Sequence, residues 1–98
     1  MLLERAELVV KPGVEEEFAA AMTTEGTRML LSVAGVKSVD LGRGVENPEK
    51  FMLLVEWESM DAHGKFASHP VYPDFRKLMG GYLQTGAMEH FEMRGVAR

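Results

Sequence analysis

The segment from Phe51 to His63 constrains the fold of this chain more than any other part of the sequence. It opens with five consecutive apolar residues, and an unbroken apolar run of this length is typical of a strand that is covered on both faces. Trp57 comes at the end of the run, and His63 follows about one turn into the next expected helix. We therefore predict a doubly buried strand with an indole and an imidazole near its end.

Length and composition indicate one domain over residues 1–98, since 46% of the residues are hydrophobic and 27% are charged. The net charge is −4 and the basic residues are scattered singly, which argues against nucleic acid as a partner. No apolar run approaches the length of a membrane span, so we expect no membrane partner and a cytoplasmic location. The absence of cysteine excludes disulfides and thiolate chemistry.

The apolar periodicity, together with glycine, proline and capping residues, predicts the order β-α-β-β-α-α-β. The strands are expected at residues 2–10, 36–42, 51–58 and 85–94, and the helices at residues 14–33, 59–67 and 71–78. This order is the split βαβ pattern, a ferredoxin-like α+β fold with a four-stranded antiparallel sheet and helices on one face. Gly26 weakens the middle of the first helix, where we expect a bend, and Met79 to Gly81 should end the last helix.

The second face of this sheet also needs a cover. Residues 51–55 do not alternate between polar and apolar, as they would if water covered that face. The chain has no spare element for the purpose, and closed two-fold dimers are the commonest oligomers. We therefore predict a homodimer in which the sheets of two copies pair; a monomeric mass in light scattering would contradict this.

Five residues are candidates for a site near the end of the central strand. Trp57 either closes the core or forms a stacking wall for a flat ligand. His63 shares a helix face with Phe66, and it either packs its ring at the surface or serves as a base at the rim of a pocket. His90, on the last strand, either faces the same cavity or hydrogen-bonds within the core. Tyr72, on the last helix, offers a further aromatic wall.

Other kinds of site find little support in the sequence. No pair of histidines has the i, i+4 spacing of a helical zinc site, so we expect no metal. No small-residue elbow surrounds a serine, and no glycine pair has a phosphate-loop or dinucleotide pattern, so we expect no nucleotide or flavin cofactor. His69 precedes a proline and is interpreted as a loop residue.

Residues 42–63, residues 66–72 and the closing Met-Glu-His-Phe of residues 88–91 resemble the antibiotic biosynthesis monooxygenase domain family. The most specific part of the likeness is Trp-Glu-Ser-Met-Asp-Ala-His at residues 57–63. The resemblance implies a ferredoxin-like fold that pairs through its sheets into a dimeric α+β barrel. It also implies several possible activities, because some members oxidise aromatic or quinol-like compounds with molecular oxygen and others bind or degrade haem.

Two branches of the family carry residue patterns that this chain lacks in part. The haem-degrading branch combines a tryptophan, matched by Trp57, with an asparagine at the position of Ala6 and a histidine near Arg76 or Leu78. The polyketide-oxidising branch has an asparagine where this chain has Leu53. The sequence therefore argues against haem degradation. Because of Leu53, the mechanism of the polyketide-oxidising branch does not carry over directly to this chain.

The leading functional hypothesis is a monooxygenase that needs no cofactor and oxidises a small aromatic or quinol-like molecule with oxygen. Such chemistry requires aromatic walls, a base that forms the phenolate, and a cation or donor for the developing oxyanion. Trp57, Phe66 and Tyr72 would supply walls, His63 or His90 the base, and Arg5 or Arg43 the charge. The alternative is a dimeric module that binds a small molecule without chemistry, and haem binding is a third hypothesis.

Overall fold

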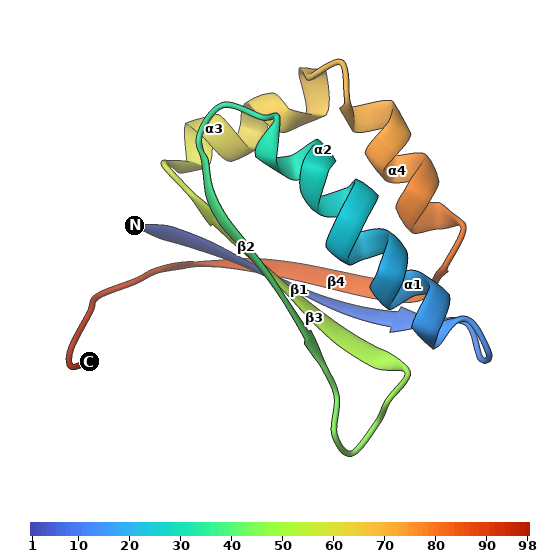
Figure 1. Ribbon diagram of the computed structural model, residues 1–98. Helices are drawn as coiled ribbons and strands as arrows, with labels where there is room; N and C mark the ends of the chain where they lie inside the picture. The colour runs from blue at the N-terminus through green and yellow to red at the C-terminus, as the bar shows by residue number, and fades with distance from the viewer.

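The computed structural model describes all residues from 1 to 98 and shows one sheet with its helices on one side (Figure 1). The sheet is antiparallel, with the strand order β2-β3-β1-β4. The strands are β1 (Leu2–Val10), β2 (Val36–Arg43), β3 (Lys50–Trp57) and β4 (Leu83–Glu92). The helical segments are α1 (Glu15–Ala21), η1 (Met22–Gly26), α2 (Thr27–Leu31), α3 (Met60–Lys65), η2 (Phe66–Ser68) and α4 (Tyr72–Gly80). The predicted element order and the ferredoxin-like α+β class are confirmed.

The two central strands bury every second side chain against the helices. On β3 the residues from Phe51 to Trp57 at odd positions are buried, and on β1 the even positions from Leu2 to Val10 are buried. Side chains that alternate along a strand point to opposite faces, so these two sets line the same face of the sheet. The helices cover that face and enclose the core.

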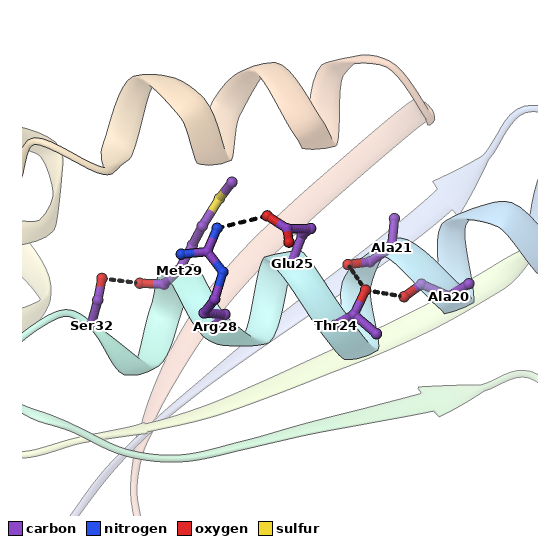
Figure 2. Close-up of polar contacts among 7 residues, drawn as sticks. All are labelled: Ala20, Ala21, Thr24, Glu25, Arg28, Met29 and Ser32. Carbon is purple, nitrogen blue, oxygen red and sulfur yellow. Dashed lines mark hydrogen bonds and ion pairs between the residues drawn. The ribbon is translucent and has the colours of Figure 1, made fainter.

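The first helical stretch is continuous but contains a wider, π-helical turn at Met22–Gly26. The Thr24 hydroxyl donates a hydrogen bond of 2.7 Å to the Ala20 carbonyl (Figure 2). The Thr27 hydroxyl donates one of 2.8 Å to the Met22 carbonyl. Gly26 is buried in this turn, where an added Cβ would lie 2.6 Å from the end of the Met22 side chain. The bend expected at Gly26 therefore takes the form of one widened turn.

The last helix and the last strand differ from the predicted boundaries. Helix α4 continues through Gly80, whereas the sequence placed its end at Leu78. Strand β4 begins at Leu83 rather than at residue 85, because Val10 at the end of β1 still pairs with Leu83. The nearby backbone amide of Lys11 also donates to the Tyr82 carbonyl at 2.9 Å.

The face of the sheet opposite the helices is mixed in character. Met52 and Leu54 of β3 lie there half-buried, as expected for an uninterrupted apolar run. Their partners on β1 are Glu7 and Arg5, so charged side chains alternate with the apolar ones. In the single chain this face is thus less apolar than residues 51–55 alone suggest. No helix of the chain has the length and apolar character that crossing a membrane requires.

Candidate functional site

A cavity of about 550 Å³ lies between the helix-facing side of β1 and β4 and the segment formed by α3, η2 and α4. Its lining is mainly apolar, with 11 hydrophobic residues among 17. Those with large side chains are Leu8, Leu53, Phe66, Tyr72, Phe75, Met79, Leu83 and Met88. Glu4, His63 and Arg76 are the acidic and basic members of the lining. Small-molecule sites commonly combine a concave apolar surface with a few such polar groups.

Glu4 is the buried carboxylate of this site, with 8% of its surface exposed. It lies on β1 between Leu2 and Ala6 on the face that the helices cover. The indole nitrogen of Trp57 donates a hydrogen bond of 2.9 Å to Glu4 Oε1. That bond satisfies part of the carboxylate's need for donors and fixes its orientation in an otherwise apolar surrounding.

His63 and His90 meet each other beside Glu4. Ser59 caps α3 by accepting a hydrogen bond of 3.1 Å from the Ala62 amide, and His63 follows in the last turn of this short helix. His90 lies directly opposite Glu4 in the register of β4 and β1, so both side chains point to the helix-covered face. The two histidine Nε2 atoms are 3.3 Å apart, and His63 Nε2 is 3.4 Å from Glu4 Oε1.

The surroundings of His63 favour its neutral form. Burial lowers the pKa of His63 below its ordinary value of 6.5, the negative charge of Glu4 opposes this shift, and the neighbouring His90 adds to it. At neutral pH the His63 imidazole therefore keeps a lone pair and can accept a proton. Glu4, His63 and His90 are called the Glu-His-His cluster below. The cluster can accept a proton where Glu4 and His63 line the apolar cavity, whereas His90 is not among the lining residues.

The predicted aromatic residues are close together, but only two of the three face the cavity. Phe66 and Tyr72 both line it, with their ring centroids 4.9 Å apart in an edge-to-face arrangement. Trp57 has no exposed surface, and His63 and Phe66 cover it, with ring centroids 5.2 and 5.8 Å away. The indole thus lies behind the cavity wall, where it orients Glu4 and offers no surface to a ligand.

The cations proposed from the sequence lie elsewhere. Arg5 is on the opposite face of the sheet and pairs with Glu89 at 3.1 Å. Arg43 pairs with Glu16 at 2.6 Å and does not line the cavity. Arg76 of α4 lines it instead, with its guanidinium carbon 5.9 Å from the centroid of the Tyr72 ring. His69 lies in the turn before α4, where its Nδ1 accepts a hydrogen bond from the Val71 amide.

Sequence reasoning missed Glu4 and the position of Arg76. The signal for Glu4 was present, because it interrupts an alternating set of apolar residues at even positions of β1. A carboxylate on the buried face of a strand needs a partner, and such residues are functional candidates. Arg76 follows Tyr72 by four residues on a helix, a spacing that places both on one face.

The same three side chains are the ones in this chain that are placed to hold a metal ion. One ligating atom from each of Glu4, His63 and His90 lies within 4.8 Å of the others. No spacing pattern for a metal site is visible in the sequence, because the three residues come from β1, α3 and β4, far apart along the chain.

Comparison with known proteins identifies the family. The family model for antibiotic biosynthesis monooxygenase matches residues 1–78. The uncharacterized protein YczJ of Bacillus subtilis (strain 168) is 30% identical over 94 residues, which cover 94% of this chain and 98% of YczJ. The chain belongs to the antibiotic biosynthesis monooxygenase family.

Solved structures share the fold over nearly the whole chain. A Bordetella bronchiseptica protein, described as an antibiotic biosynthesis monooxygenase, matches with a TM-score of 0.88 and 27% identity. The match covers 95% of this chain and 96% of the Bordetella protein. SnoaB, a cofactor-independent oxygenase from Streptomyces nogalater, matches with a TM-score of 0.84 and 15% identity, covering 97% of this chain and 94% of SnoaB. At the latter identity the likeness concerns the fold alone.

Proposed function

We propose that this protein is a monooxygenase that needs no cofactor and oxidises a small, electron-rich phenol or hydroquinone with molecular oxygen. The observation that carries the proposal is the Glu-His-His cluster at the wall of an apolar cavity of about 550 Å³. Membership of the antibiotic biosynthesis monooxygenase family supports the reaction class. The cofactor-independent oxygenase SnoaB has the same fold, so this fold accommodates such chemistry.

The cavity suits an aromatic substrate of a few rings. Phe66 and Tyr72 present ring surfaces against which a flat molecule can pack, and Phe75 extends the apolar wall. An apolar wall excludes water from the ring, which strengthens electrostatic interactions with its hydroxyl group. A cavity of this volume lies within the usual range for small ligands.

His63 is the proposed base. Its neutral imidazole takes the proton of the substrate hydroxyl, and the negative charge of Glu4 then stabilises the resulting imidazolium. The phenolate is a much better electron donor than the phenol. The guanidinium of Arg76, on the same cavity, is placed to stabilise negative charge on the substrate or on reduced oxygen.

The substrate itself supplies the electrons in this scheme. The phenolate transfers one electron to oxygen, and the resulting radical and superoxide combine at a ring carbon that carries a hydrogen, which gives a hydroperoxide after protonation. Loss of water from the hydroperoxide leaves a carbonyl at that carbon, so one oxygen atom enters the quinone product and the other leaves as water. No external reductant is required.

A homodimer through the open sheet face is part of the proposal. Leu3, Met52 and Leu54 give this face an apolar component that a single chain leaves half-exposed. The cavity lies on the opposite, helix-covered face, so pairing of the sheets leaves it intact in each protomer.

Oxygen consumption with a panel of hydroquinones and polycyclic phenols tests the function. We expect uptake that depends on the protein, falls at least about tenfold in His63→Gln, and is unchanged in His69→Gln, whose side chain lies outside the cavity. Equal turnover in the wild type, His63→Gln and His90→Gln would discard the base assignment. Quenching of the single tryptophan by these phenols without oxygen uptake would identify a binding module instead.

A further inference from the structure

We infer that Glu4, His63 and His90 form a binding site for one divalent transition-metal ion of the Zn²⁺ or Co²⁺ type. The inference goes beyond the proposed oxidation, which requires no metal. It rests on how the three side chains converge, on their separations and on their chemistry.

The ligating atoms of the three side chains lie within 4.8 Å of one another, and His63 Nε2 is close to both of the others. His63 Nε2 faces both Glu4 Oε1 at 3.4 Å and His90 Nε2 at 3.3 Å. A ring nitrogen carries either one hydrogen or one lone pair, so it can satisfy only one of these contacts by a hydrogen bond. Glu4 Oε1 already accepts the indole hydrogen of Trp57. A cation between the three groups would satisfy all of them together.

The separations are those of ligands around a small ion. Zinc binds imidazole nitrogen and carboxylate oxygen at about 2.0–2.1 Å in tetrahedral sites, where neighbouring ligand atoms are then about 3.3–3.4 Å apart. The two contacts of His63 Nε2 measure 3.3 and 3.4 Å. The remaining pair, from His90 to Glu4, lies within 4.8 Å, so a bound ion would draw these two ligands closer together.

The donor set selects the class of metal. Two imidazoles and one carboxylate suit zinc, cobalt, nickel, copper and ferrous iron, whereas magnesium and calcium prefer oxygen ligands throughout. The hydrogen bond from Trp57 to Glu4 is an outer interaction of the kind that orients metal-binding carboxylates.

The proposed ion would have an open position toward the cavity. Glu4 and His63 both line the cavity, so three protein ligands leave a fourth position on that side for water or a substrate oxygen. A bound metal would also occupy the His63 lone pair. If the oxidation depends on His63 as the base, Zn²⁺ should then inhibit it.

Metal titration tests the site directly and needs no substrate. Tag-free protein, treated with EDTA and desalted, is titrated with Co²⁺ by visible absorption and with Zn²⁺ by calorimetry. We expect one saturable ion per chain, visible bands typical of a low-coordinate nitrogen and oxygen site, and no competition from Mg²⁺. Glu4→Gln, His63→Gln and His90→Gln should each weaken binding by about tenfold or more.

His69→Gln is the matched control, since it also removes a histidine but leaves the cluster intact. Wild-type affinity in this variant supports the site. The inference is overturned if the wild type binds no ion saturably, or if the cluster variants bind as tightly as the wild type. Circular dichroism checks folding, and if His63→Gln fails to fold, His90→Gln on the largely exposed strand β4 decides the question. Failure of metal binding leaves the oxidation assay unaffected.

Discussion

The indole nitrogen of Trp57 donates its hydrogen bond to Glu4, and the two residues are the largest fully buried side chain and the one buried charged residue of the chain. They lie on neighbouring strands, because Trp57 pairs with Leu2 and Glu4 pairs with Val55. The oxygen that receives the indole hydrogen is also the one 3.4 Å from His63. The core and the candidate site therefore share a single carboxylate.

Trp57→Phe should destabilise the protein by about 2–4 kcal/mol, because it removes buried volume and leaves the Glu4 carboxylate without its donor. Glu4→Leu in the same background removes the unsatisfied carboxylate. The double variant should therefore lose less stability than the sum of the two single variants. Urea unfolding of all four proteins measures this coupling, and strictly additive losses would show that the hydrogen bond contributes nothing.

His63 should titrate below the ordinary value of 6.5 in the metal-free protein, because burial disfavours its charged form. This lowered pKa makes the stability of the folded protein depend on pH. Between 6.5 and the lowered pKa the unfolded chain binds more protons than the folded one, so stability falls as the pH falls through that window. Nitrogen-detected NMR of the imidazole rings measures the titration directly.

Two variants separate the causes of this shift. Glu4→Gln removes a negative charge that raises the pKa of His63, so its midpoint should fall further. His90→Gln removes a neighbour that lowers the pKa, so the midpoint should rise. A His63 midpoint at or above 6.5 in the wild type, or shifts opposite to these, would contradict the arrangement of the cluster.

Much of the fold was predictable because each element carries its own signal. The alternation along residues 2–10, the apolar run of residues 51–55 and the cap at Ser59 all act locally, and the structure confirms the elements they predict. The start of β4 was not predictable in this way. Leu83 joins the strand because Val10 is there to pair with it, and this partner is distant in sequence.

The site was predictable only as a set of residue types. His63, Phe66 and Tyr72 were expected near one another, since they follow closely along one stretch of the chain. Whether Trp57 faces a ligand or the core depends on how closely α3 packs over β3, and the sequence left that question open. The meeting of Glu4 with His63 depends on the register of β1 and on the position of α3 together, which no spacing pattern encodes.

Leu54→Glu tests the proposed pairing of two sheets. Leu54 is half-buried at the centre of the open face, between Arg5 and Asp40 of the neighbouring strands. Arg5 already pairs with Glu89 at 3.1 Å, so a new carboxylate at position 54 would lose its water in a dimer without gaining a cation of its own. We expect light scattering to show a dimer for the wild type and a monomer for this variant. Val45→Glu is the control, because Val45 is 88% exposed in the loop between β2 and β3. A wild-type monomer, or a dimer that survives Leu54→Glu, would contradict this interface.

Ala67→Trp tests whether the cavity is the place where a substrate binds. Ala67 lines the cavity from η2, and an indole at this position would fill much of the space beside Phe66 and Tyr72. We expect phenol binding and oxygen consumption to fall at least about tenfold, as when a ligand pocket loses its volume, while the unfolding midpoint stays close to that of the wild type. Ala20→Trp adds the same bulk on the exposed side of α1 and should leave both measurements unchanged. Undiminished activity in a folded Ala67→Trp protein would show that the reaction takes place elsewhere.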